Sequence, residues 1–163
     1  MEEHKNNFVH LPYRKGVGIM LLNDEGGVFV GKRIDTRSEA WQMPQGGIDD
    51  GEDCEVAAYR ELEEETSIKN VELLYQSKEW HRYDFPEHLV PKLWNGGFRG
   101  QQQKWFLMRF KGQDTEININ TAEPEFCAWK WSPTDELNDI IVPFKRALYQ
   151  KIITEFKEHV LQA

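Results

Sequence analysis

The sequence predicts an α/β or α+β sandwich formed by a single domain, residues 1–163. Short β-prone runs separated by turn residues indicate a sheet, and one run of helical composition interrupts them. A second helical run closes the chain. The length suffices to bury one core, and no repeat, low-complexity tract or linker divides it.

The first predicted element is a hairpin. Its β-prone runs, 16–22 and 28–32, flank the turn residues 23–27, where glycine supplies the positive φ that a tight connection needs. The further strand candidates are Val71–Gln76, Glu79–Tyr83, Lys104–Phe110 and Glu125–Trp131. Residues 85–100, rich in Pro, Gly and Asn, are predicted to form a long loop of the kind that often carries function.

Two segments are predicted to be helical. Glu52–Thr66 has helical composition, with Asp49 or Asp50 as a candidate N-cap. In Pro143–Leu161, apolar residues recur every four positions and form a stripe down one helix face. The stripe consists of Phe144, Leu148, Ile152, Phe156 and Val160. It predicts core packing.

Composition excludes several classes of protein. The formal net charge of −8 argues against a broad basic face, so double-stranded DNA is not an expected partner. The longest apolar run, Val17–Leu22, is too short to span a bilayer, and no membrane partner is expected. Cys54 and Cys127 provide neither a disulfide framework nor a paired metal-ligand spacing. These features predict a cytoplasmic protein and leave its oligomeric state open.

The most informative segment is a Gly/Asp loop followed by a glutamate-rich helix. On a helix, Glu61, Glu64 and Glu65 project within an arc of about 100°, and Ala57 one turn earlier is expected to leave open space above them. Carboxylates this close repel one another, and the arrangement is best tolerated around a hard cation such as Mg²⁺. The alternative is an ordinary solvated acidic face. Tyr59 and Val56 lie on other sides of the helix and can pack inward, as can Ala58 and Leu62.

Arg60 and Glu52 are the second feature of this segment. In one straight helix Arg60 would lie about 80° around the axis from Glu52, and a direct pair would be poor. If Glu52 instead lies in the loop, Arg60 can reach back to it and brace the loop over the helix. The spacing leaves both arrangements open.

This segment resembles the Nudix box, G-x5-E-x7-R-E-U-x-E-E-x-G-U with U an aliphatic residue, over residues 46–68. The matching positions are Gly46, Glu52, Arg60, Glu61, Leu62, Glu64, Glu65 and Ile68. The one departure is Ser67, where the family has Gly. A Gly just past the helix would take a positive φ, which costs Ser about 1 kcal/mol.

The resemblance extends from about Leu11 to Phe156. Beyond the box it rests on the segments 13–18, 41–47, 100–106, 124–126 and 143–146. These resemble the bacterial RNA 5′-pyrophosphohydrolases, also described as dinucleoside polyphosphate hydrolases. The resemblance implies the Nudix fold, a mixed β-sheet between helices with the box as loop–helix–loop. It also implies Mg²⁺, or Mn²⁺ or another divalent cation in its place, on Glu61, Glu64, Glu65 and Glu125.

The residues suit attack of water on a phosphorus atom of a polyphosphate. A divalent cation would neutralise phosphate oxygens and lower the pKa of a bound water. Glu64 is the expected general base, with Glu61 and Glu65 on the metal, and Arg60 and Glu52 complete the expected catalytic set.

Substrate contacts are expected from cations, from the box entrance and from aromatic residues. The predicted contacts are Arg14, Lys32, Arg33, Gln45, Gly46, Tyr83, Lys104, Phe144 and Lys145. Lys145 falls in the first helical turn, where the helix dipole disfavours a cation unless an anion binds there. Ordinary surface ion pairing is the alternative for each cation, and core packing is the alternative for Tyr83 and Phe144.

The preferred function is removal of pyrophosphate from the 5′-triphosphate end of RNA, which leaves a 5′-monophosphate. Hydrolysis of dinucleoside polyphosphates such as diadenosine tetraphosphate is the alternative within the same enzyme class. A non-catalytic RNA- or nucleotide-binding module is the alternative from another class. Its signature would be loss of box carboxylates, and all of them are present.

Overall fold

A computed structural model describes residues 8–34 and 40–162, and within them the strands form one eight-stranded sheet. The strands are β1 (Tyr13–Leu22), β2 (Val28–Arg33), β3 (Trp41–Gln42), β4 (Gln45–Gly47), β5 (Val71–Gln76), β6 (His81–Asp84), β7 (Gly100–Phe110) and β8 (Phe126–Ser132). At its centre β1 runs parallel to β7, from the pair Tyr13–Gly100 to the pair Leu22–Arg109. The other pairs are antiparallel.

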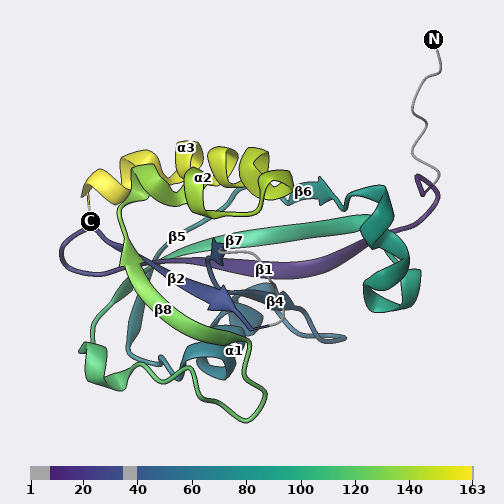
Figure 1. Cartoon of the computed structure of the whole chain (residues 1–163). Coiled ribbons are helices and arrows are strands. Elements are labelled where there is room, and N and C mark those ends of the chain that lie inside the picture. The colour runs from purple at the N-terminus through teal and green to yellow at the C-terminus, as the bar shows by residue number, and fades with distance from the viewer. Residues whose placement is uncertain (1–7, 35–39, 163) are drawn as a thin grey trace.

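Helices cover both faces of the sheet. As Figure 1 shows, α1 (Cys54–Thr66) lies on one face, whereas α2 (Leu137–Ile140) and α3 (Arg146–Gln162) lie on the other. Short 3₁₀ helices occur at Glu87–Lys92, Trp94–Gly96, Asp114–Glu116, Thr134–Glu136 and Pro143–Lys145. This arrangement confirms the predicted fold class, a mixed sheet between helices.

Each face of the sheet has its own hydrophobic core. Along β1, Val17, Ile19 and Leu21 belong to the core beneath α1, whereas Met20 and Leu22 belong to the core beneath α3. Side chains alternate between faces along a strand, so a strand that is covered on both faces is a continuous apolar run. The run 17–22 is therefore the centre of the sheet.

Most predicted elements are present, with shifts at their ends. The hairpin is confirmed, and β5 has the predicted bounds. Helix α1 begins at Cys54 with Asp53 as its N-cap, so the expectation of Asp49 or Asp50 in that role is wrong. The predicted loop 85–100 contains two 3₁₀ helices. Its backbone forms turns that carry their own hydrogen bonds, which composition alone did not reveal.

Two predictions about α1 were wrong. Ala57 is fully buried in the core beneath α1 and does not leave open space above the carboxylates. Val56, expected to pack inward, is 55% exposed. Ala58 and Leu62 are buried as expected. The helix is therefore turned about its own axis so that Ala57, and not Val56, faces the core.

The terminal helix is confirmed, with a 3₁₀ turn at its start. Leu148, Ile152 and Phe156 of the predicted stripe are buried against the sheet, and Phe144 and Val160 are partly buried at its two ends. None of the helices in the described residues is both long and apolar enough to cross a membrane.

Candidate active site

The loop before α1 is held by one arginine. Arg60 Nε donates to Glu52 Oε2 at 2.8 Å, and Arg60 Nη2 donates to Glu52 Oε1 at 2.9 Å and to the Gly47 carbonyl at 2.9 Å. Glu52 precedes the helix, so of the two arrangements that the spacing left open the structure has the one in which Arg60 braces the loop. These hydrogen bonds from Arg60, with a further one from the Asp49 backbone, lower the pKa of Glu52 to about 2.

The remaining nitrogen of the same guanidinium reaches the helix carboxylates. Arg60 Nη1 donates to Glu61 Oε1 at 3.0 Å and to Glu64 Oε2 at 3.1 Å. The Glu61 carboxyl group also packs directly against Gly46. A Cβ at Gly46 would overlap it, so only glycine fits there. Loop and helix are thus joined at Arg60 and Gly46, both of which belong to the Nudix-box pattern.

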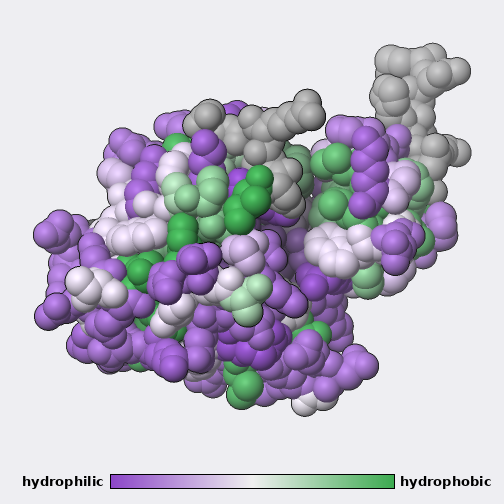
Figure 2. Space-filling view, turned by 60° about the horizontal axis from the view of Figure 1, so that its bottom comes forward, coloured by the Kyte–Doolittle hydropathy of each residue, from purple (hydrophilic) through white to green (hydrophobic). Residues whose placement is uncertain are grey.

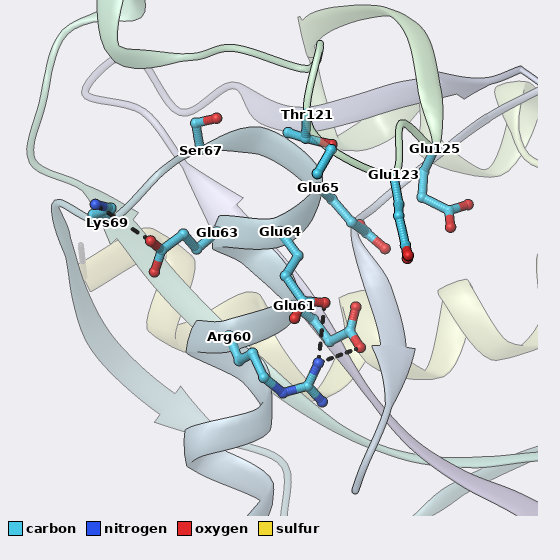
Figure 3. Close-up of a pocket in the computed structure, with 11 residues that line it drawn as sticks. Arg60, Glu61, Glu63, Glu64, Glu65, Ser67, Lys69, Thr121, Glu123 and Glu125 are labelled. Atoms are coloured by element: carbon cyan, nitrogen blue, oxygen red, sulfur yellow. Dashed lines mark hydrogen bonds and ion pairs between the residues drawn. The ribbon is translucent and has the colours of Figure 1, made fainter.

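The carboxylates line a pocket of about 860 Å³ between α1 and the segment that leads into β8. Figure 3 shows the carboxyl groups of Glu65 of α1 and of Glu123 and Glu125 of that segment on the same side of the pocket, with Glu61 below them. Glu63 points away from this group toward Lys69, with which it forms an ion pair at 3.3 Å. The exposed Glu125 therefore lies beside the helix carboxylates, and it precedes β8, whereas the strand prediction placed it as the first residue of that strand.

Glu65 is the most enclosed of these groups. It is 6% exposed, and its Oε2 has no hydrogen-bond partner. Burial raises the pKa of Glu65 well above its ordinary value, and the neighbouring charges of Glu61 and Glu125 raise it further. Burial also raises the pKa of Glu61. A buried carboxylate with a bare oxygen beside other carboxylates is a donor set that suits a hard divalent cation.

Among the described residues, no three His, Cys, Asp or Glu side chains are already arranged around one metal position. Arg60 accounts for part of this, because its guanidinium holds an oxygen of Glu61 and an oxygen of Glu64. A cation would therefore compete with Arg60 for these two oxygens, while the bonds from Arg60 to Glu52 could remain.

The segment before β8 supplies residues that the sequence did not reveal. Thr121 and Glu123 line the pocket together with Glu125, and the Thr121 hydroxyl is buried without a hydrogen-bond partner. Ser67 and Lys69, just past α1, line it too. Of this segment, the family resemblance covered residues 124–126 and implied a role for Glu125.

Two of the predicted phosphate contacts lie beside the carboxylates. Arg14 interacts electrostatically with Glu61 and with Tyr83, and its Nη1 donates to Gln101 Oε1 at 3.2 Å. Arg33 interacts electrostatically with Glu65 and with Tyr83. Their positive charges therefore act on both the carboxylates and Tyr83. Lys32 is the neighbour of Arg33 in β2.

The other predicted cations lie elsewhere. Lys104 donates to the carbonyls of Ser77 and Lys78 at 3.3 and 2.9 Å, and it is not among the residues that line the carboxylate pocket. Lys145 is buried, with its amine 5.6 Å from the centre of the Tyr83 ring. Lys104 is therefore not brought to the carboxylates, and Lys145 is brought to the aromatic residues.

The aromatic predictions separate in the structure. Tyr83 is 8% exposed within the core beneath α3, and its hydroxyl accepts a hydrogen bond from Gln101 Nε2 at 2.5 Å. Burial raises its pKa to about 12. Phe144 is half-buried and lies 6.1 Å from Tyr83, ring centre to ring centre. Tyr83 thus has the environment of a core residue, whereas Phe144 presents part of its surface to solvent.

The chain matches the NUDIX domain over residues 12–152 and therefore belongs to the Nudix family. It is a Nudix hydrolase, a class that generally uses divalent cations. Two of its relatives have a more specific name than the family. It is 54% identical to the RNA pyrophosphohydrolase of Rickettsia typhi over 96% of this chain and 98% of the relative. The RNA pyrophosphohydrolase of Rickettsia prowazekii is 53% identical over the same shares.

Solved structures confirm the fold. The Escherichia coli dihydroneopterin triphosphate pyrophosphohydrolase superposes with a TM-score of 0.69 at 19% identity, over 88% of this chain and 99% of that one. A Caenorhabditis elegans Ap4A hydrolase complex superposes with a TM-score of 0.61 at 17% identity, over 88% and 98% of the two chains.

Proposed function

We propose that this protein removes pyrophosphate from the 5′-triphosphate end of RNA and leaves a 5′-monophosphate. The observation that carries the proposal is the placement of Arg14 and Arg33, each of which interacts electrostatically with a carboxylate of the acidic site and with Tyr83, the ring beside Phe144. A polyphosphate on the arginines would extend toward the acidic pocket and its nucleoside toward the aromatic side. The relatives named RNA pyrophosphohydrolase support RNA as the substrate, and a cytoplasmic location is part of the proposal.

The residues that would hold Mg²⁺, or Mn²⁺ in its place, are Glu61, Glu64, Glu65 and Glu125. When bound, the cation neutralises phosphate oxygens and activates water. The bare oxygen of buried Glu65 supports this assignment, because it is a strong acceptor with no donor of its own.

Glu64 is the carboxylate suited to accept a proton. Its side chain is 57% exposed, against 14% for Glu61, so it is the one that water can reach most easily. The oxygen of the attacking water bonds to phosphorus as the anhydride P–O bond breaks, and its proton passes to Glu64. Arg14 and Arg33 stabilise the negative charge that develops on the phosphate oxygens. Arg60 and Glu52 act by holding the loop and helix together.

Hydrolysis of dinucleoside polyphosphates is the second candidate. The net charge of −8 disfavours a long polyanion, and this favours a small ligand. The structural likeness to an Ap4A hydrolase shows a shared fold at 17% identity and does not choose between the two substrates.

The test compares initial rates on 5′-triphosphorylated RNA and on diadenosine tetraphosphate, at equal low concentrations with Mg²⁺. The variant is Glu64→Gln, and the matched control is Glu63→Gln, since Glu63 lies on the same helix but points away from the carboxylate group. Glu64→Gln is expected to lower kcat at least 100-fold, whereas Glu63→Gln should stay within about twofold of wild type.

Faster release of pyrophosphate from RNA, lost in Glu64→Gln, supports the proposal. Faster cleavage of the dinucleotide makes the second candidate the main activity. Wild-type protein that binds RNA with Mg²⁺ but cleaves neither substrate would overturn the hydrolytic proposal in favour of a binding module.

A further inference from the structure

The segment between β6 and β7 projects from the end of the sheet at which β1 and β7 begin (Figure 1). Figure 2 shows this end of the molecule as a lobe on which hydrophobic and hydrophilic residues are mixed. Trp94 opens the second 3₁₀ helix of the segment, and its side chain is 44% exposed. Arg14, a proposed phosphate contact, is the second residue of β1 and lies at the same end of the sheet.

The backbone that presents Trp94 is strained. Trp94 and Asn95 have positive φ angles of 44° and 57°, and Gly96 follows at 73°. The left-handed region is disfavoured for residues with a Cβ, and bulky residues are rare in it. Hydrogen bonds from the Gly96 amide to the Leu93 carbonyl at 2.9 Å and from the Gly97 amide to the Trp94 carbonyl at 3.1 Å close the turn. Strained conformations persist where surrounding contacts hold them, so the contacts of this side chain are informative.

Two side chains hold the Trp94 ring. Phe85 is buried and stacks on it, with ring centres 5.6 Å apart and planes inclined by 23°. The guanidinium carbon of Arg14 lies over the same ring, 4.5 Å from its centre. A guanidinium is attracted by the π electrons of an aromatic ring, and tryptophan is the strongest partner for this contact. Trp94 therefore joins a core residue to a charged side chain.

Arg14 is confined by further contacts. Its Nη1 donates to Gln101 Oε1 at 3.2 Å, and a Cβ at Gly47 would overlap its Nη2. Gly47 ends β4, the strand that leads into the Nudix-box loop. Arg14 also interacts electrostatically with Glu61. The guanidinium is thus packed against the backbone of the box, while its charge acts on a carboxylate of the box.

The Arg14 guanidinium keeps donors for a ligand. It has five N–H groups, and within the described part of the chain its side chain forms one hydrogen bond, to Gln101. Arginine recognises phosphate through a planar fork of paired donors, so the orientation of the plane matters as well as the charge. A fork that is already oriented loses less conformational freedom when the ligand binds.

We propose that Trp94 is a positioning residue, whose ring holds the Arg14 guanidinium in the plane in which it receives the phosphate chain of the substrate. The inference rests on the proposed function, in which Arg14 binds phosphates. Without the ring, Arg14 keeps its charge but gains freedom to turn away from Gly47, and phosphate binding weakens. The strained turn at residues 94–96 is then the means by which the ring reaches Arg14.

The experiment uses the full chain with Mg²⁺. Its probe is a 5′-triphosphorylated dinucleotide with methylene groups in place of the anhydride oxygens, whose Kd calorimetry measures without cleavage. The value of kcat/KM for 5′-triphosphorylated RNA is measured beside it. Trp94→Phe keeps an aromatic ring, whereas Trp94→Leu keeps an apolar side chain without π electrons. Trp94→Gln is a second variant without a ring, in case leucine destabilises the turn.

Each Trp94 variant is made alone and together with Arg14→Gln, so that the coupling between the two side chains is measured directly. The matched control is Trp80→Leu, alone and with Arg14→Gln. Trp80 is 37% exposed, and its ring lies 5.9 and 5.7 Å from the amines of Lys15 and Lys104. It therefore has the same kind of cation contact, made with other cations.

Trp94→Leu and Trp94→Gln should weaken binding of the analogue about fivefold and lower kcat/KM by a similar factor. Trp94→Phe should stay within about twofold of wild type. In the Arg14→Gln background, replacement of Trp94 should have no further effect, because the group that it positions is gone. Trp80→Leu should change neither quantity in either background.

The inference is overturned if the Trp94 variants without a ring bind as wild type does, or if their losses are the same with and without the Arg14 side chain. Equal losses for phenylalanine and leucine at position 94 would also overturn it. Wild type that binds the analogue but cleaves no triphosphorylated RNA would count against the proposed function, and the binding measurements would still decide the role of Trp94. Wild type that does not bind the analogue would overturn both.

Discussion

Glu65 is the residue whose surroundings differ most from water. Its carboxylate is buried, has an unpartnered oxygen and lies near the charges of Glu61 and Glu125. Without a bound cation, burial of this charge lowers the stability of the protein, and a bound cation would remove that cost. Stability and cation binding are therefore linked at this residue.

We predict that Glu65→Gln stabilises the protein in a chelator at neutral pH by about 1 kcal/mol, a rise of roughly 3 °C in Tm. A raised pKa means that the cost is absent below pH 4.5 and grows as pH rises, so the gain should be larger at pH 8 than at pH 5. Mg²⁺ should raise the Tm of wild type more than that of the variant. Glu63→Gln is the control, and a Glu65→Gln variant less stable than wild type in chelator would contradict the prediction.

Glu52 has the opposite shift. Hydrogen bonds from Arg60 and from the Asp49 backbone lower its pKa from 4.5 to about 2, so its charged form is favoured in the folded protein. Such a group stabilises the fold above pH 4.5, and that contribution is lost as pH falls toward 2. We predict that Glu52→Gln is less stable than wild type at pH 7 and that the difference narrows between pH 4.5 and 2. Urea unfolding across this pH range measures the difference in unfolding free energy between the two proteins. A difference that does not change with pH would contradict a lowered pKa of Glu52.

At the scale of elements, the exit of α1 is set by one backbone angle. Ser67 follows the helix in the left-handed conformation, with φ 66° and ψ 7°. This is the conformation expected from the Gly that the Nudix box has at this position. The Ser67 hydroxyl donates to the Asn118 carbonyl at 2.8 Å, which offsets part of the strain.

We predict that Ser67→Gly changes the free energy of unfolding by less than about 1 kcal/mol, because relief of strain opposes loss of the exposed hydrogen bond. Ser67→Val should lower it by about 2 kcal/mol, since a β-branched residue is disfavoured at positive φ and also lacks the hydroxyl. Thermal unfolding of the two variants measures this. Equal stability of Val and Gly at position 67 would be inconsistent with a strained helix exit.

Local pattern predicted α1 and its carboxylates because the helical period places Glu61, Glu64 and Glu65 on one side without reference to the rest of the chain. The rotation of that helix on the sheet was not predictable in the same way. Ala57 faces the core and Val56 faces solvent because α1 must fit between the glycines of β4 and the core residues of β1 and β7. Hydrophobicity alone would place Val56, and not Ala57, against the core.

At the scale of the whole molecule, the site depends on contacts between segments far apart in sequence. Glu123 and Thr121 reach the pocket because β8 pairs with β2 and because Asn118 is hydrogen-bonded to the end of α1, which together bring residues 121–125 beside the helix. The family resemblance predicted Glu125, but no local pattern marks Thr121. The positions of Lys104 and Tyr83, one away from the carboxylates and the other in the core, likewise follow from the sheet register.

The two layers of the fold meet at Tyr149. Its hydroxyl accepts a hydrogen bond from the backbone N–H of Met43 at 2.8 Å, and both residues are fully buried. Met43 lies between β3 and β4, in the connection that leads into the Nudix box, and Tyr149 lies on α3, so this bond links the terminal helix to the entrance of the active-site loop. The Tyr149 ring also packs edge-on against Trp105 of β7.

Tyr149→Phe would keep the ring and leave the buried N–H of Met43 without a partner. We predict a loss of about 1–3 kcal/mol in the free energy of unfolding, seen as one cooperative transition at lower denaturant, because the bond joins both layers. The half-exposed Tyr59 is the control, and Tyr59→Phe should change stability by less than about 0.5 kcal/mol. The rate at which the folded variant cleaves triphosphorylated RNA at 25 °C should change little, since the carboxylates lie on α1 and on the segment before β8 and not on α3. A Tyr149→Phe protein as stable as wild type would show that water or a backbone shift satisfies Met43, and the link between α3 and the loop would then lie in apolar packing alone.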